Sequence, residues 1–284
     1  MIMAKFEYEY PHPAVATDCV VFGFDGRELK VLLVERGVDP YKGMWAFPGG
    51  FLRMDETAEE CARRELEEET GLALAKVREL GSFSGVNRDP RERVITIAFY
   101  SLARHSAVRG GDDVAKARWW AVDDIPQLAF DHDYILRKAM ERIRRDIHFE
   151  PVGFDLLDEQ FTIAELQRLY ESILGVQFDR RNFYRKMLQT GVLQEVEEAG
   201  APTYYGRRKE MKRMAIDNLF GGPAESGATP PAQDGNSDMA AVGMRGEPAG
   251  PERGHAVGRK GKLFRFNEER YNRMKEDGNF RLEF

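Results

Sequence analysis

The sequence predicts an α/β domain over residues 1–150, followed by a smaller domain of helices and a two-stranded ribbon over residues 151–284. Three observations support this fold class. Apolar, β-branched runs are interspersed with amphipathic stretches up to residue 147, the composition changes at Pro151, and 284 residues suit two domains better than one small domain. With 42% hydrophobic residues, the chain can bury a substantial core.

The first domain begins with a predicted β-hairpin. Residues 17–24 and 29–36 are apolar runs on either side of Asp25-Gly26, a pair typical of tight turns. Residues 45–48 form a short extended segment, because the residue before Pro48 avoids the helical region. Further elements are predicted as strands at 76–84, 93–102 and 117–122, and as an amphipathic helix at 131–147.

A helix is predicted between the extended segment and the strand at 76–84. Thr57 and Glu60 have the spacing of a capping box, so the helix should begin near Ala58, and Gly71 suits its C-cap. Apolar residues recur every four positions from Ala58 to Leu66, which gives the helix a buried stripe.

Three glutamates of this helix share one face, because Glu65, Glu68 and Glu69 are spaced i, i+3, i+4. Like charges at this spacing repel by about 0.2–0.5 kcal/mol per pair. Hard carboxylate oxygens suit Mg²⁺ or Mn²⁺, which also bind phosphate oxygens. A solvated acidic face is the alternative, and an isolated acidic run would favour it. Here Gly50, Glu56 and Arg64 are all in register with the three glutamates, which favours a metal site.

The complete pattern resembles the Nudix box, the metal-binding helix of enzymes that hydrolyse nucleoside diphosphates linked to another group. The matching positions are Gly50, Glu56, Arg64, Glu65, Leu66, Glu68, Glu69, Gly71 and Leu72. The resemblance implies an α/β/α sandwich and Mg²⁺ or Mn²⁺ as cofactor. It also implies cation binding by Glu65, Glu68, Glu69 and the Gly50 carbonyl, while Arg64 orients Glu65 and Glu56 pairs within the box.

The identity of the general base stays open. One of the box glutamates is a candidate. Some Nudix enzymes use a loop carboxylate instead, so Asp112 and Asp113 after Gly110-Gly111 are candidates too. A polar turn between strands explains these two aspartates equally well.

Arginines in loops are the softer candidates for substrate binding. Arg36 ends a predicted strand and could reach a phosphate, or could be a solvated strand terminus. Arg88 and Arg91 lie in a predicted turn and could bind phosphate or ribose, although loop arginines are more often surface charge. The tryptophans, Trp45, Trp119 and Trp120, are expected to pack rather than to stack on a base, and His132 is expected to be structural.

The second domain has the element order of a winged helix-turn-helix. A helix over 162–174 should bury Ile163, Leu166, Leu169, Tyr170 and Ile173 and end at Gly175. A second helix over 179–190, with Asp179 as N-cap and Gly191 as its stop, should bury Phe183, Met187 and Leu188. Strands are expected at 192–196 and 262–266, a short helix at 204–219, and a disordered wing insertion at 221–258, where nine glycines and five prolines occur.

The second helix of this domain is the predicted DNA reader. Its outward side chains can bind phosphates and read base edges, since arginine suits guanine and asparagine suits adenine. A basic helix in a dimerisation module is the alternative. The proposed DNA-binding residues are Arg180, Arg181, Asn182, Tyr184, Arg185 and Lys186.

Several stretches also resemble the bacterial Nudix-related transcriptional regulators, in which a Nudix domain is fused to a winged helix. They include NRDPRERVITIAFYSL, LAFDHDYIL and FTIAELQRLYESILGVQFDRRNFYRKML. The resemblance implies ADP-ribose or a related nucleotide as ligand and a homodimer on a palindromic double-stranded DNA operator. Many members of that family have an eroded box. The box here keeps every specified position, so a bifunctional hydrolase and regulator is expected. The alternatives are a non-hydrolysing ADP-ribose-sensing repressor of NAD or sugar metabolism genes and a hydrolase with a dimerisation domain.

Composition excludes some classes of protein. A net charge of −6 argues against indiscriminate nucleic-acid binding. No apolar run is long enough to span a membrane, and residues 1–13 have no apolar signal core, so a cytoplasmic protein, nucleoid-associated when bound to DNA, is expected. Cys19 and Cys61 are expected to be free thiols.

Overall fold

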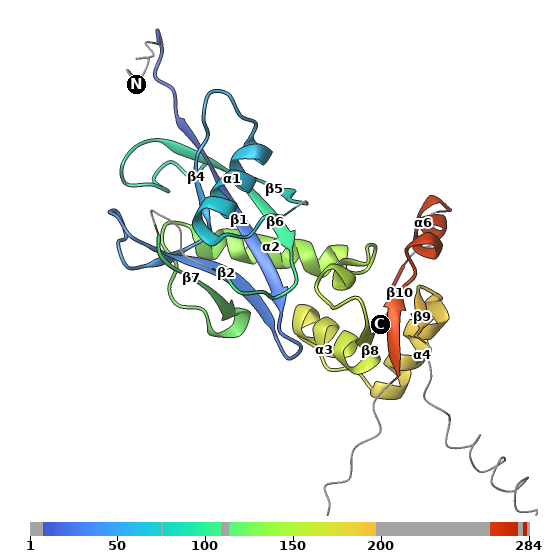
Figure 1. The fold of residues 1–284 in the computed structure, drawn as a ribbon. Helices are drawn as coiled ribbons and strands as arrows, with labels where there is room; N and C mark the ends of the chain where they lie inside the picture. The colour runs from blue at the N-terminus through green and yellow to red at the C-terminus, as the bar shows by residue number, and fades with distance from the viewer. Residues whose placement is uncertain (1–7, 75, 109–113, 197–261, 278–280, 283–284) are drawn as a thin grey trace, which may run out of the picture. The chain divides into compact units, whose positions relative to one another are not determined.

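The computed structural model describes residues 8–74, 76–108, 114–196, 262–277 and 281–282 (Figure 1). The first part of the chain forms a mixed seven-stranded sheet with the order β3-β2-β1-β6-β5, to which β4 is added through β1 and β7 through β2. The long β1 pairs parallel with β6 and antiparallel with β2. The strands are β1 (Ala14–Phe24), β2 (Leu29–Arg36), β3 (Trp45–Ala46), β4 (Gly49–Phe51), β5 (Arg78–Phe83), β6 (Val94–Leu102) and β7 (Val114–Ala121).

Two helices cover the two faces of this sheet, α1 (Ala58–Thr70) and α2 (His132–Asp146). Side chains alternate between the faces of a strand, and β1 shows the consequence. Val20 and Phe22 belong to the buried cluster that contains α2, whereas Cys19 and Val21 belong to the cluster that contains α1. The predicted α/β/α sandwich is therefore confirmed. Short 3₁₀ helices follow at Val122–Asp124 and Val152–Asp155.

The ends of α1 confirm the capping signals in the sequence. The Thr57 hydroxyl accepts the Glu60 N–H at 3.3 Å, and the Glu60 carboxylate accepts the Thr57 N–H at 2.8 Å. Gly71 closes the helix with a left-handed φ of 71°. Leu66 is fully buried against the sheet, so the acidic side of the helix has a fixed rotation relative to β1.

The second part of the chain has the predicted winged-helix order. Helices α3 (Ile163–Leu174) and α4 (Arg180–Thr190) are followed by the antiparallel strands β9 (Leu193–Glu195) and β10 (Leu263–Phe266). A short strand, β8 (Phe161–Thr162), adds a third member to the ribbon, and α6 (Glu268–Glu276) follows β10. Neither β8 nor α6 is predicted above. The Asn267 side chain, which accepts the Arg270 N–H at 2.9 Å, is the local signal that starts α6.

One core assignment in this domain is wrong. Phe183 and Met187 are buried as expected, but Leu188 is 39% exposed. At about 100° per residue, position 188 lies well off the face that positions 183 and 187 share, so its side chain points outward. The predicted short helix at 204–219 and the insertion at 221–258 lie outside the described residues.

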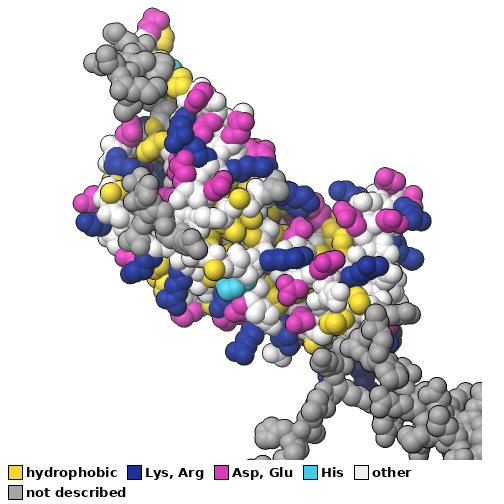
Figure 2. Space-filling model, in the orientation of Figure 1, with side chains coloured by type: hydrophobic (Ala, Val, Ile, Leu, Met, Phe, Trp, Pro, Cys, Tyr) yellow, Lys and Arg dark blue, Asp and Glu magenta, His cyan; other side chains and the backbone are white. Residues whose placement is uncertain are grey.

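The described surface has mixed charge. Figure 2 shows Lys and Arg side chains interspersed with Asp and Glu side chains over the face in view. Cys19 and Cys61 are both free and buried. Within the described ranges, no helix has the length and apolar character needed to cross a membrane.

The register between β1 and β4 depends on a glycine at position 49. Gly49 is opposite Asp18, and a Cβ atom at Gly49 would lie 2.1 Å from the Thr17 carbonyl oxygen. We therefore expect Gly49→Ala to lower the free energy of unfolding by about 3 kcal/mol, the upper end of the range for overpacked sites. Urea unfolding of the full chain measures this difference.

Gly85→Ala is the matched control. A Cβ atom at Gly85 would have its nearest neighbour at 3.8 Å, so that variant should stay within about 0.5 kcal/mol of the wild type. Equal stabilities for the two variants would contradict the close approach of β4 to β1.

Candidate functional site

A cavity of about 380 Å³ lies against the acidic side of α1. Its walls include residues of β1, the end of β2, the 46–51 segment, α1, the loop at 88–91 and the start of α2. The cavity brings together six of the predicted site residues, and its lining does not include Arg64 or Glu68. The six are Arg36, Gly50, Glu65, Glu69, Arg88 and Arg91.

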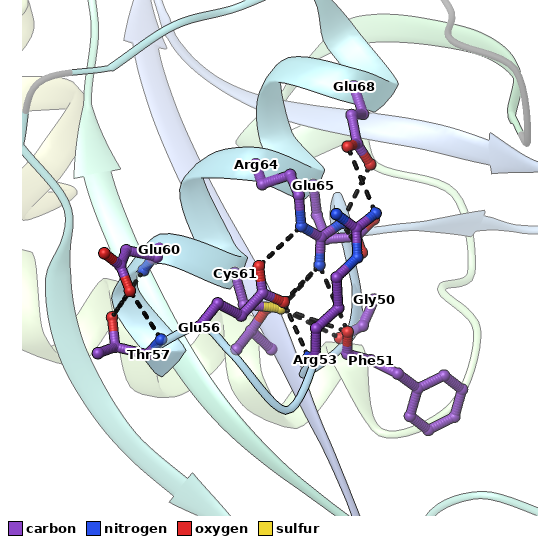
Figure 3. Close-up of polar contacts among 11 residues, drawn as sticks. Gly50, Phe51, Arg53, Glu56, Thr57, Glu60, Cys61, Arg64, Glu65 and Glu68 are labelled. Atoms are coloured by element: carbon purple, nitrogen blue, oxygen red, sulfur yellow. Dashed lines mark hydrogen bonds and ion pairs between the residues drawn. The ribbon is translucent and has the colours of Figure 1, made fainter. Parts of the chain in front are cut away.

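Arg64 organises the outer side of the acidic helix (Figure 3). Its guanidinium group holds both carboxylate oxygens of Glu56, at 2.8 and 2.6 Å. The same group donates to Glu65 at 2.5 Å and to Glu68 at 3.0 Å. The hydrogen bonds from Arg64 hold the pKa of Glu56 at about 2, so Glu56 stays ionised. Arg64 thus fixes the orientation of Glu65 and draws Glu68 away from the cavity.

Glu65 lies directly against the backbone of Gly50. A Cβ atom at Gly50 would sit 2.4 Å from the Glu65 carboxyl carbon, so a side chain at this position would displace the carboxylate. Cys61 connects the same segment to β1, since its thiol donates to the Phe51 carbonyl at 3.6 Å and accepts from the Thr17 hydroxyl at 3.3 Å. Burial raises the pKa of the Cys61 thiol to about 11, which keeps it protonated.

Glu69 has the most unusual electrostatic environment in the cavity. Its carboxylate accepts the Gly49 N–H at 3.0 Å, which favours the charged form. Burial opposes ionisation more strongly, with added repulsion from Glu65 and Asp18, and together these effects raise the pKa of Glu69 to about 8. Glu69 therefore holds a proton that a bound cation would replace.

The donor set of the cavity fits a divalent cation. Among the acids that the structure describes in its lining, Asp18, Glu65 and Asp89 each have an arginine partner, whereas the contact found for Glu69 is a backbone amide. Glu65 and Glu69 supply hard oxygen ligands next to the Gly50 backbone. Within the described residues, no three His, Cys, Asp or Glu side chains are gathered closely enough to form a complete site.

The opposite wall consists of a buried polar network. Asp18 of β1 lies 3.4 Å from both Arg88 Nη2 and His132 Nε2. Burial alone would raise the pKa of Asp18, but His132 and Arg88 outweigh it and lower the pKa. Arg88 also donates to both oxygens of Asp131, at 3.2 and 2.7 Å. The Arg88 guanidinium is thereby committed to two carboxylates, which limits its capacity to bind a ligand.

Two other arginines face an aromatic ring at the cavity edge. The guanidinium carbons of Arg36 and Arg91 lie 4.7 and 5.8 Å from the centre of the Phe130 ring. Asp89 is buried and holds Arg91 through two hydrogen bonds, at 3.0 and 2.7 Å. Phe130 has a positive φ of 55°, a strained conformation for a bulky residue. These two cations suit an anionic ligand such as a phosphate.

Sequence reasoning missed four residues of this region. Asp18, Asp89 and Phe130 line the cavity, and Asp131 holds Arg88. A charged residue inside the apolar run 17–24 was the available signal for Asp18. His132, expected to be structural, also lines the cavity. The base candidates Asp112 and Asp113 lie outside the described residues. Trp45 and Trp120 pack edge to face at 5.2 Å, as expected.

The basic helix α4 has the exposed face that the sequence predicts. The Asp179 side chain caps it by accepting the Asn182 N–H at 2.8 Å. Arg185 Nη2 donates to the side-chain Oδ1 of Asn182 at 2.8 Å, so these two side chains are pre-ordered. The exposed residues on this face are Arg180, Arg181, Asn182, Tyr184 and Arg185, with Lys186 partly buried.

Comparisons with known proteins agree with both halves of this description. The sequence matches the family described as NUDIX domain over residues 12–142 and the family described as NrtR DNA-binding winged helix domain over residues 153–211. The ADPR responsive transcriptional repressor NtrR of Acinetobacter baylyi is 31% identical over 196 residues, which cover 67% of this chain and 78% of that protein.

One further relative and one solved structure are also similar to this chain. The ADP-ribose pyrophosphatase of Methanocaldococcus jannaschii is 42% identical over 132 residues, which cover 46% of this chain and 75% of that protein. The crystal structure of Shewanella oneidensis NrtR complexed with a 27mer DNA is similar with a TM-score of 0.56 and 31% identity. That match covers 66% of this chain and 90% of that chain.

The raised pKa of Glu69 predicts a pH-dependent stability. The folded protein binds this proton up to a pH of about 8, whereas the carboxyl group in the unfolded chain has a pKa near 4.5. The folded state therefore holds the extra proton between these values, and stability is lost as the pH rises through this window. We expect the melting temperature in EDTA to fall from pH 5 to pH 9, and Glu69→Gln to reduce that fall.

Glu67→Gln is the control, because Glu67 is an exposed glutamate of the same helix. It should keep the wild-type pH profile in thermal unfolding. An unchanged profile in Glu69→Gln would contradict the assignment of the raised pKa to Glu69.

Proposed function

This chain belongs to the NUDIX proteins that carry an NrtR-type DNA-binding winged helix, and we propose that it is a transcriptional regulator that binds and hydrolyses ADP-ribose or a related nucleotide. One relative is named as an ADPR responsive repressor and another as an ADP-ribose pyrophosphatase. The combination of an intact acidic box with a basic helix in one chain supports a bifunctional protein.

The observation that carries the hydrolase proposal is the arrangement of Glu65, Glu69 and Gly50 in one cavity with Arg36 and Arg91. Glu65 and Glu69 would hold Mg²⁺ or Mn²⁺ together with the Gly50 carbonyl. A bound divalent cation would lower the pKa of a water molecule and neutralise charge on the leaving phosphate. Arg36 and Arg91, on the Phe130 side, would hold the diphosphate by charge-assisted hydrogen bonds.

The role of Glu68 in this proposal differs from that of the other two glutamates. Its side chain is 52% exposed and paired with Arg64, so it would approach the cation after that ion pair rearranges. Arg64 would then remain held by Glu56 and continue to orient Glu65.

A non-hydrolysing sensor is the second candidate function. The observation in its favour is that, over the described ranges, the acidic side chains do not form a complete cation site, while Arg64 occupies Glu65 and Glu68. If the protein is such a sensor, the cavity would bind ADP-ribose, and that binding would be the signal for DNA release. Target genes in NAD or sugar metabolism would fit either candidate.

The winged helix would bind double-stranded operator DNA through α4. Its proposed contacts are the exposed residues from Arg180 to Arg185, together with Lys186. A homodimer on a palindromic operator would place two such helices one helical turn apart.

Hydrolysis is tested by incubating the full chain with ADP-ribose and Mg²⁺. We expect release of AMP and ribose 5-phosphate, because the cleaved bond is the diphosphate linkage. Glu69→Gln should lower kcat/KM by about 10²–10⁴-fold, the range for loss of a group that moves protons or organises charge. Glu67→Gln should retain activity.

Absence of AMP release by the wild type with Mg²⁺ or Mn²⁺ would remove the hydrolase and leave the sensor. A gel shift with the upstream region of its own gene then decides whether ADP-ribose releases DNA. The sensor requires Glu69→Gln to keep that response.

DNA binding is tested by Arg181→Ala, which removes an exposed cation from α4. We expect the affinity for the operator to fall about 5- to 150-fold, equivalent to about 1–3 kcal/mol for a base-edge contact. Fluorescence anisotropy at fixed salt measures it. Nucleotide hydrolysis should not change.

Arg27→Ala is the matched control, because Arg27 is an exposed arginine in the turn between β1 and β2. Its removal should leave DNA affinity unchanged. Equal losses in the two variants would point to nonspecific charge attraction rather than to binding through α4.

A further inference from the structure

A buried chain of hydrogen bonds connects β1, the 45–50 segment and the first turn of α2. His132 is 2% exposed, and its Nδ1 accepts the Phe47 N–H at 3.0 Å. A ring nitrogen that accepts a hydrogen bond carries no proton, so this contact requires the tautomer with its proton on Nε2. That Nε2 atom lies 3.4 Å from Oδ1 of buried Asp18. Asp18 thus selects the tautomer that leaves Nδ1 free to accept from Phe47.

The same segment is fixed on both sides of Phe47. The Trp45 carbonyl accepts the Ala129 N–H at 2.8 Å, and the Pro48 carbonyl accepts the Cys19 N–H at 2.9 Å. The rings of Phe47 and His132 are stacked, with centres 5.0 Å apart and planes inclined by 11°. Loss of the His132 acceptor would leave the buried Phe47 N–H without that bond, which favours a shift of the backbone at Phe47.

The contacts to the acidic helix begin two residues after Phe47. Gly49 donates its N–H to Glu69 at 3.0 Å, and the Gly50 backbone lies against the Glu65 carboxylate. Because only Pro48 separates Phe47 from Gly49, a displacement at Phe47 moves these backbone groups relative to Glu65 and Glu69. The position of Phe47 therefore sets the geometry of the oxygen atoms that would surround a cation.

We propose that His132 and Asp18 are positioning residues of the cation site, which act on Glu65 and Glu69 through the Phe47 amide and the Gly49-Gly50 backbone. Neither residue contacts the cation in this mechanism. The inference rests on the proposed function, since it requires that the cavity binds a divalent cation.

Two substitutions at His132 distinguish the roles of the two ring nitrogens. In His132→Asn the amide oxygen lies near the place of Nδ1 and can still accept the Phe47 N–H. In His132→Gln the amide group reaches the place of Nε2, and the acceptor for Phe47 is lost. We expect Mn²⁺ affinity of the full chain, measured by electron paramagnetic resonance, to fall about 10- to 100-fold in His132→Gln, as for other groups that orient metal ligands. His132→Asn should stay close to the wild type.

The matched pair distinguishes positioning from a purely structural role. Both variants lose the same ring and its stacking on Phe47, so a structural role would lower the melting temperature of both and would not separate their Mn²⁺ affinities. Equal Mn²⁺ affinities in the two variants would overturn the inference while the cation site stands. Absence of Mn²⁺ binding by the wild type would overturn the proposed cation site itself, and with it the inference.

A measurement on the wild-type protein tests the inference without depending on whether a variant folds. Nitrogen-15 spectra of histidine-labelled protein should show His132 as the neutral tautomer with its proton on Nε2, and Mg²⁺ should shift the Phe47 amide resonance. A proton on Nδ1, or a Phe47 amide that does not respond to Mg²⁺, would overturn the inference.

Discussion

The close packing of the Gly49-Gly50 backbone between β1 and α1 is the constraint on which the rest of the site depends. A Cβ atom at Gly49 would meet the Thr17 carbonyl at 2.1 Å, and one at Gly50 would meet the Glu65 carboxyl group at 2.4 Å. Because no side chain separates these elements, backbone amide and carbonyl groups come within reach of the acidic helix. A backbone carbonyl can ligate a divalent cation, and a backbone amide can donate to a carboxylate or a phosphate.

Arginine pairing decides where negative charge remains in the cavity. Arg64 neutralises the outer carboxylates, Arg88 is shared by Asp18 and Asp131, and Arg91 is held by Asp89. Burial, with repulsion from Glu65 and Asp18, raises the pKa of Glu69, so its carboxyl group favours the protonated form. The acidic helix is thus stabilised against its own repulsion without filling the place that a cation would occupy.

The local structure was largely predictable from sequence, because its signals act over a few residues. The capping box at Thr57, the left-handed Gly71 and the buried stripe of α3 were all readable, and the family resemblance predicted the contact of Arg64 with Glu65. The predicted burial of Leu188 was wrong, because an apolar residue next to a buried position does not share its face of the helix. The short strand β8 was not predicted, since two residues carry no periodic pattern.

The sequence by itself determined the two domain types and the acidic helix, because capping, turn and periodicity signals are local. Tertiary structure alone decided that Asp18, His132 and Arg88, which are separated by up to 114 residues, form one buried network. It also decided that Glu69 faces the cavity while Glu68 faces solvent, although both belong to one helical face. The physical reason is that burial and charge pairing depend on distant chain segments that meet only when the sheet assembles.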